Sequence, residues 1–99
     1  MQTYETLISE FRTDYQIAPY VVDGTLERFA KEGEAALSSL VLSADFETDL
    51  VARSLLKNYM YYALNHVTNE FWENYRNDVT QWQWEHDDSA GEDEEEDEG

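Results

Sequence analysis

The sequence predicts an all-α fold, a small bundle of about four helices around a long central helix, followed by a disordered acidic tail. Residues 49–84 contain neither Pro nor Gly, so nothing in this stretch forces the backbone out of a helix. Apolar residues before it recur at helical spacing. Residues 85–99 carry ten acids and no Lys or Arg. We therefore divide the 99 residues into one helical domain, 1–84, and a low-complexity acidic tail, 85–99.

The first predicted helix is short and amphipathic. Within residues 3–12 the apolar side chains recur at helical spacing: Tyr4, Leu7, Ile8 and Phe11. Pro19 then restricts the residue before it to extended conformations. Residues 14–22 are therefore predicted to be a linker.

The second helix is expected to begin after an N-cap at Asp23 and to continue to Val41. Glu27 and Lys31 are spaced to form an i, i+4 ion pair on its outer face. Gly33 lies on the apolar face, where it lowers helix propensity. We expect Gly33 to mark the close approach of another helix.

A turn at residues 43–48 leads into the central helix, with Ser43, Asp45 and Thr48 as alternative caps. In the first half of this helix, apolar side chains cover most of the circumference, which is typical of a buried helix. One helix is hard to surround in so short a chain. We therefore expect a neighbouring subunit to cover part of it.

Asp49 and Arg53, at the start of the central helix, are also spaced to form an i, i+4 pair. β-Branched and capping residues cluster at residues 66–69, which predicts a break or kink there. A last amphipathic helix follows. Its apolar positions are Phe71, Trp72, Tyr75, Val79 and Trp82.

Aromatic residues are abundant: there are fourteen, and eight of them fall within residues 59–84. Tyr and Trp are enriched at protein–protein interfaces, and large apolar side chains also fill cores. We expect both uses. The candidate core residues are Leu26, Phe29, Leu37, Leu40, Leu55, Tyr62, Phe71, Tyr75 and Val79. The candidate interface residues are Tyr59, Tyr61, Trp82 and Trp84.

The net charge of −17 is unevenly distributed. Residues 1–84 contain thirteen acids and six bases, giving −7, and residues 85–99 add −10. Neither part has the basic surface that binds nucleic acid. Because high salt screens self-repulsion, such a charge also suggests a halophilic host. A melting temperature that rises between low and molar salt is expected from a halophilic protein.

No catalytic, cofactor-binding or metal-binding motif is present, so we do not expect an enzyme. His66 and His86 lack a helical His or Glu companion at metal-ligand spacing, and there is no cysteine. No Gly-rich phosphate loop occurs. The acidic tail lacks the Asp/Asn alternation and Gly of a calcium loop. No apolar run approaches the roughly 18 residues of a membrane span, so a cytoplasmic location is the default expectation.

The order of elements resembles a known family. An amphipathic helix with Asp at its start comes first. The long helix follows, with the sequence Leu50-Val51-Ala52-Arg53-Ser54-Leu55-Leu56-Lys57-Asn58-Tyr59-Met60-Tyr61-Tyr62-Ala63. The last element is the aromatic helix Glu70-Phe71-Trp72-Glu73-Asn74-Tyr75. Across residues 4–84 this resembles the head–tail connector (head-completion or adaptor) proteins of long-tailed double-stranded DNA viruses. The acidic tail is not typical of that family.

The resemblance implies a structural virion protein. Such proteins form a homo-oligomeric ring, commonly of twelve subunits, beneath the portal protein. The ring extends the DNA channel and prepares the head to accept a tail-completion or neck protein. Double-stranded DNA passes through without sequence-specific binding. The implied location is the head–tail interface of the virion, and the host cytoplasm during assembly.

The alternative reading is an acidic DNA-mimic or chaperone-like protein that binds basic partners. That reading predicts a monomer or dimer whose affinity for basic proteins falls as salt rises. A small regulatory enzyme or toxin–antitoxin component is the least favoured class, because no set of residues would carry a reaction.

Overall fold

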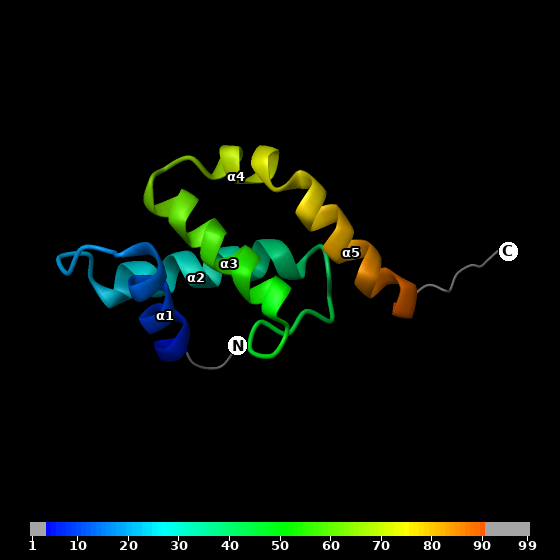
Figure 1. The fold of residues 1–99 in the computed structure, drawn as a ribbon, viewed down its shortest axis with the longest axis horizontal. Coiled ribbons are helices and arrows are strands. Elements are labelled where there is room, and N and C mark those ends of the chain that lie inside the picture. Colours follow the sequence, from blue (N-terminus) through cyan, green and yellow to red (C-terminus); the bar gives the residue numbers. More distant parts are fainter. Residues whose placement is uncertain (1–3, 91–99) are drawn as a thin grey trace, which may run out of the picture.

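The computed structural model describes residues 4–90, which form five α-helices and no strand. The all-α prediction is confirmed, with five helices in place of about four. The helices are α1 (Glu5–Tyr15), α2 (Asp23–Ser38), α3 (Leu50–Leu64), α4 (Thr68–Asn74) and α5 (Arg76–Ala90) (Figure 1). Of the tail predicted to be disordered, residues 85–99, the part from 91 to 99 lies outside the described residues, and for 85–90 the prediction is wrong. Residues 85–90 continue α5.

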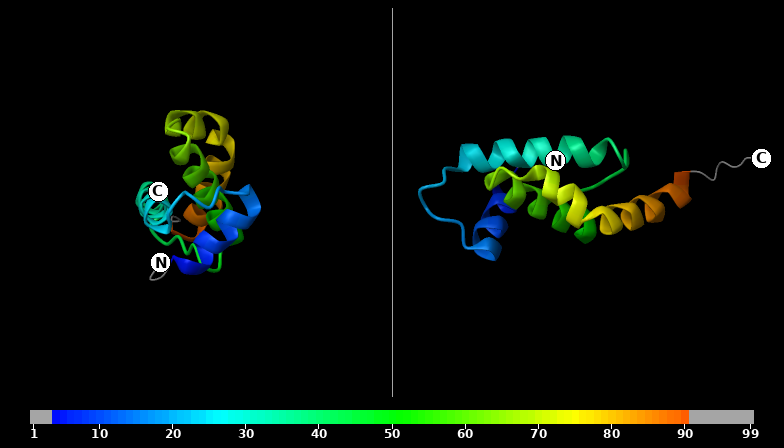
Figure 2. Two further views of the ribbon diagram at one scale, coloured as in Figure 1. Left: turned by 90° about the vertical axis from the view of Figure 1, so that its left-hand side faces the viewer. Right: turned by 90° about the horizontal axis from the view of Figure 1, so that it is seen from above.

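Helix α3 lies in the middle of the molecule (Figure 1). Its most extensive contact is with α2, and α1, α4 and α5 also pack against it. The view from above shows α5 leaving the bundle as a projecting helix (Figure 2, right). This arrangement explains why α3 is apolar on so much of its circumference: four helices of the same chain cover it.

The core draws on all five helices and on the loop between α2 and α3. Its largest fully buried side chains include Phe11, Leu26, Leu56, Phe71 and Trp82. Aromatic rings join α3 to α4 and to Tyr75, the residue between α4 and α5, by edge-to-face contacts, which is a favoured geometry for such pairs. The ring centroids of Tyr59 and Phe71 are 5.4 Å apart, and those of Tyr62 and Tyr75 are 5.9 Å apart.

Two helices start differently from expectation. Val22, not Asp23, is the N-cap of α2, and Asp23 binds Arg12 of α1 at 2.7 Å. Its carboxylate is thus directed to a neighbouring helix and does not cap its own. Asp49 is the N-cap of α3, in place of the three alternatives in the preceding turn. One of these, Asp45, accepts the amide hydrogens of Glu47 and Thr48 and shapes the turn itself.

The predicted break at residues 66–69 is confirmed. Helix α3 ends at Leu64, and His66 has a φ of 63°, a left-handed conformation that stops a helix. A second break at Tyr75 separates α4 from α5 and was not predicted. The Tyr75 ring stacks on Phe71, with centroids 5.2 Å apart, and this packing holds the chain at its bend.

One core candidate is misplaced. Leu40 is 38% exposed, because α2 ends at Ser38 and the chain turns before reaching it. The hydroxyl of Ser39 donates to the carbonyl of Ala36 and competes with helix continuation. Tyr62 and Tyr75 lie at the core edge, partly buried. The remaining candidates are buried: Leu26, Phe29, Leu37, Leu55, Phe71 and Val79.

Gly33 of α2 faces Tyr59 and Leu56 of α3, as its position on the apolar face predicted. A Cβ at this position would lie 2.7 Å from Cδ1 of Tyr59 and 2.8 Å from Cδ1 of Leu56. Both distances are shorter than carbon atoms tolerate. The absence of a side chain at Gly33 therefore sets how closely α2 and α3 pack.

We predict that Gly33→Ala destabilises the fold by about 1–3 kcal/mol, because the added methyl must displace two buried side chains. Urea unfolding followed by circular dichroism measures the change. Gly24→Ala is the matched control: nothing lies within 4 Å of its Cβ position, so better helix propensity makes it neutral or stabilising. Equal effects at the two glycines would contradict the proposed close packing.

Candidate protein interface

The structure separates the four candidate interface residues into two groups. Tyr59 and Trp82 are buried within the monomer, which corrects their assignment to an interface. The Tyr59 ring fills the space left by Gly33, and its hydroxyl donates to Glu32 at 2.7 Å. Burial and this carboxylate raise the pKa of Tyr59 above its ordinary value. Tyr61 and Trp84 are exposed, at 40% and 71%, and remain available to a partner.

Asp49 connects the start of α3 to α5. Its Oδ1 accepts the amide hydrogens of Val51, at 3.0 Å, and Ala52, at 3.3 Å, which are two of the donors that a helix start leaves unpaired. Its Oδ2 accepts the indole N–H of Trp82 at 3.2 Å and lies 3.1 Å from Nε2 of His86. One carboxylate thus caps α3 and holds the buried side of α5.

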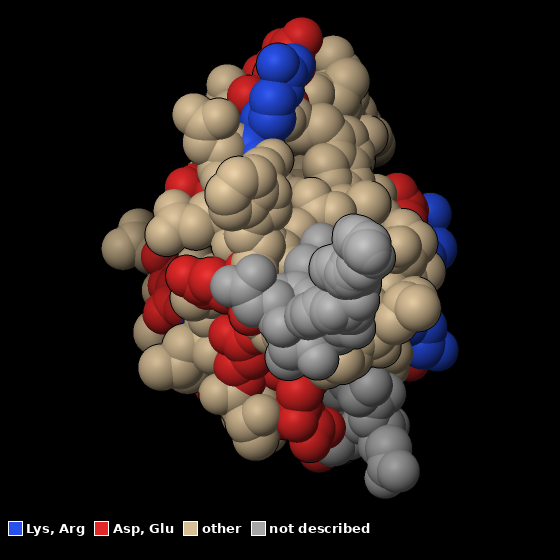
Figure 3. All heavy atoms as spheres, turned by 90° about the vertical axis from the view of Figure 1, so that its right-hand side faces the viewer, with Lys and Arg blue, Asp and Glu red and all other residues tan. Residues whose placement is uncertain are grey.

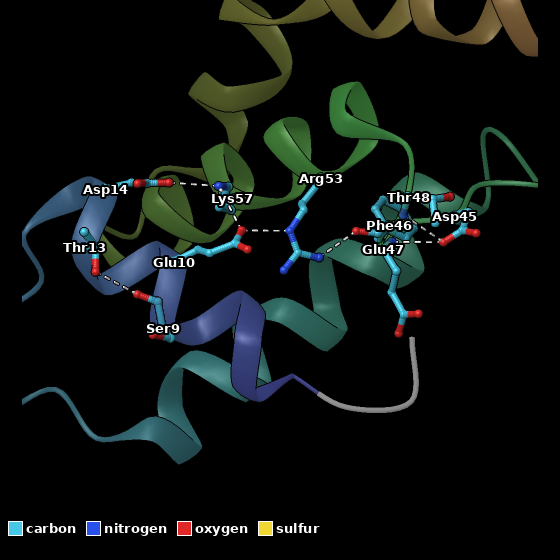
Figure 4. Close-up of polar contacts among 10 residues, drawn as sticks. All are labelled: Ser9, Glu10, Thr13, Asp14, Asp45, Phe46, Glu47, Thr48, Arg53 and Lys57. Carbon is cyan, nitrogen blue, oxygen red and sulfur yellow. Dashed lines mark hydrogen bonds and ion pairs between the residues drawn. The ribbon is translucent and has the colours of Figure 1, made fainter.

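A cluster of charged residues joins α1 to α3 (Figure 4). Glu10 lies between Arg53, at 2.8 Å, and Lys57, at 3.4 Å, and Lys57 also binds Asp14 at 2.8 Å. A second guanidinium nitrogen of Arg53 donates to the carbonyl of Phe46 at 2.9 Å. Arg53 pairs with Glu10 and not with Asp49 as expected, because the Asp49 carboxylate caps α3.

An open groove of about 760 Å³ runs beside this cluster, between α1 and α3. Its cationic side chains, Arg53 and Lys57, already bind acids of the same chain. The hydrogen bond from Arg53 is the main reason that the pKa of Glu10 lies below its ordinary value. We therefore assign the cluster a structural role, which is to fix α1 on α3.

Exposed apolar side chains gather at the two ends of α2. Tyr20, 86% exposed, and Val22 lie in the loop before it, and we call this pair the Pro19 end. Leu40 and Leu42, the latter 91% exposed, lie in the loop after it, and we call this pair the Leu42 end. Helix α2 has 16 residues, which corresponds to about 24 Å between the two ends. Figure 1 shows these loops on different sides of the molecule.

A smaller groove, of about 370 Å³, lies between α3 and α5. Leu50 and Val51 border it on α3, where both are exposed, and the buried Trp82 lies on its α5 side. Asp78 and Glu85 line it along α5. No Lys or Arg is among the residues that line it.

The charge distribution is uneven on the face that includes the end of α5 (Figure 3). In this view Asp and Glu gather in the lower left part, while Lys and Arg lie at the upper and right margins. Uncharged side chains form part of the surface between them.

Metal and membrane sites receive no support from the described residues. Among residues 4–90 there is no group of three or more His, Asp or Glu side chains that would hold a metal ion. None of the helices in that part of the chain combines the length and apolar character that a membrane crossing requires. His66 ends α3, and His86 binds Asp49.

Sequence reasoning missed the Pro19 end because it falls in residues 14–22, which are predicted to be a linker. It missed the Leu42 end because the second helix is expected to continue to Val41, with Leu40 in the core. The available signal was the apolar pairs Val21-Val22 and Val41-Leu42, each adjoining a helix boundary. In each pair the first residue turns inward and the second outward.

Comparison with known proteins places the chain in no family. No protein-family model matches it, and neither do curated proteins or solved structures.

We predict that Asp49→Ala destabilises the protein by about 1–2 kcal/mol or more, because α3 loses its cap and the Trp82 indole loses its acceptor. Asp49→Asn retains a capping oxygen and is expected to lose less stability than Asp49→Ala. Urea unfolding monitored by tryptophan fluorescence measures both. An alanine variant as stable as the parent chain would refute the role of Asp49 as the link between α3 and α5.

We predict that stability falls in acid partly through Glu10. The pKa of Glu10 is lowered in the fold, so its contribution is present above its ordinary pKa and is lost as the pH falls through the folded value. The side chain is partly exposed, so the effect is below about 1 kcal/mol. Unfolding free energies of the parent and Glu10→Gln, measured from neutral pH to acid, should converge as Glu10 protonates. A constant difference across that range would count against the assignment.

Proposed function

We propose that this protein is a structural subunit that associates head to tail into a homo-oligomeric ring, and that the ring is a head–tail connector beneath a viral portal. The observation that carries self-association is the pair of exposed apolar ends separated by α2. Support for the connector identity comes from the helix order and the aromatic final helices, which resemble that family. A ring of about twelve subunits is the form this resemblance implies.

The two apolar ends differ in composition and position. Tyr20 and Val22 form one, and Leu40 and Leu42 form the other. When two unlike surfaces of one chain bind each other, the contact is heterologous, and repetition of the contact gives a closed ring or an open filament. A symmetric dimer in which one end binds the same end of a second copy would leave the other end exposed. Head-to-tail association covers both on every subunit.

The charge of the chain fits a DNA channel and sets the conditions for assembly. A net charge of −17 repels phosphate, so DNA passing through the ring would not adhere to its wall. The same charge repels other copies of the chain at low ionic strength. Salt screens this repulsion over distances beyond roughly 10 Å and strengthens apolar contacts. Assembly is therefore expected to increase with salt, in keeping with the proposed halophilic host.

We predict that the mass of the purified protein, measured by light scattering at low and molar salt, increases with salt. Tyr20→Ser with Val22→Ser, and Leu40→Ser with Leu42→Ser, should each remain monomeric, because each double variant retains only one end. Mixing the two variants should give a one-to-one dimer, in which the intact Leu42 end of one binds the intact Pro19 end of the other.

This mixing experiment distinguishes the possible interfaces. If one end instead binds the same end of a second copy, the double variant without that end stays monomeric and the other double variant still dimerises. Mixing the two variants then restores no contact. A parent chain that stays monomeric at every salt concentration, and with portal protein present, would refute the connector. If that monomer instead bound basic proteins with an affinity that falls as salt rises, the acidic-mimic function would replace the connector function.

A further inference from the structure

The groove between α3 and α5 has the dimensions of a short helix. The residues that line it extend from Leu50 to Asn58 on α3 and from Tyr75 to Glu85 on α5. At about 1.5 Å per residue these spans correspond to about 12 Å and 15 Å, or two to three helical turns. The two helices make few direct contacts along it, since α5 diverges from the bundle (Figure 1).

The groove is apolar inside and acidic along one edge. Leu50 is 77% exposed although it begins a helix whose other apolar residues are largely buried. With Val51 it supplies the exposed apolar surface of the groove, and the buried Trp82 lines the α5 side. On α5, Asp78 and Glu85 are seven residues apart, which places both carboxylates on the same side of the helix. The α3 edge carries the uncharged Ser54 and Asn58.

A second copy of the chain is a poor match for this edge. Four of its six basic residues already bind acids within their own chain: Arg12, Lys31, Arg53 and Lys57. Of the basic residues of a second copy, Arg28 and Arg76 are left for the carboxylates of Asp78 and Glu85. A different protein with free Lys or Arg side chains satisfies them.

We propose that this groove binds a helical segment of a partner protein, with an apolar face toward Leu50 and Val51 and Lys or Arg side chains toward Asp78 and Glu85. Apolar burial supplies most of the affinity of a helix bound in a groove. The carboxylates fix its orientation, since the basic edge must lie along α5. This site is separate from the two apolar ends, and it does not depend on ring formation.

The test uses the full chain and a fluorescein-labelled designed peptide of about three helical turns. The peptide has a Leu face with Lys along one edge, and its twin has Gln at every Lys position. Fluorescence anisotropy measures binding at low and molar salt. The Lys peptide should bind more tightly than its twin, and its affinity should fall as salt rises, opposite to the salt dependence of self-association.

Three double variants locate the site. Asp78→Asn with Glu85→Gln should weaken binding by about threefold to tenfold, as expected for two exposed ion pairs. Glu70→Gln with Glu73→Gln makes the same charge change on exposed residues of α4, away from the groove, and should leave the affinity nearly unchanged. Leu50→Gln with Val51→Thr removes apolar surface without changing the charge and should weaken binding at least tenfold.

Several outcomes would overturn the proposal. Equal weakening by the α4 and α5 charge variants would show that the peptide senses only the overall negative charge. Equal binding of the Lys peptide and its Gln twin would remove the role of the carboxylates. Failure of the Lys peptide to bind at low salt would exclude the groove as a site for such a helix, and ring formation would be unaffected by that result.

Discussion

The close packing of α2 and α3 at Gly33 is the constraint on which the rest of the bundle depends. Because Gly33 has no side chain, the Tyr59 ring of α3 lies directly against the α2 backbone. Tyr59 then contacts Phe71 and Trp72 of α4, with ring centroids 5.4 Å and 6.0 Å away. The position of α4 therefore depends on a residue in α2, through one tyrosine. Helix α1 is held by its buried side chains, Leu7, Ile8 and Phe11, and by the charged cluster around Glu10.

Local patterns in the sequence predicted much of this fold, and long-range contacts decided the rest. Helical spacing located the helices, and clustered β-branched residues located the break after α3. The ion pair between Glu27 and Lys31 formed at 3.0 Å, as their i, i+4 spacing on one helix predicted. The pair expected between Asp49 and Arg53 did not form, because backbone amides and Trp82 occupy Asp49. Arg53 binds Glu10 instead, 43 positions away in the sequence, and no local pattern shows such a partner.

The aromatic residues show the same limit. Periodicity correctly placed Trp82 on the apolar side of its helix, but it did not show the bend at Tyr75 that turns α5 toward the core. Without that bend, Trp82 near the end of the chain resembles an exposed anchor for a partner. The candidate site was likewise only partly predictable. An apolar pair beside a helix boundary gives no sign of which residue turns outward until the packing of the helix is known.

The opposite environments of Trp82 and Trp84, two residues apart on α5, give the protein a pair of built-in spectroscopic probes. Trp82 is buried beside Phe46 and Asp49, so its emission reports whether α5 is packed on the bundle. Trp84 is exposed, so its emission reports whether something covers the outside of the same helix. Docking of a partner on that side would change the Trp84 signal and leave that of Trp82, whereas detachment of α5 would change Trp82. With Phe in place of Trp72 and of one of these two tryptophans, the remaining indole reports alone, and assembly is separated from unfolding without an attached dye.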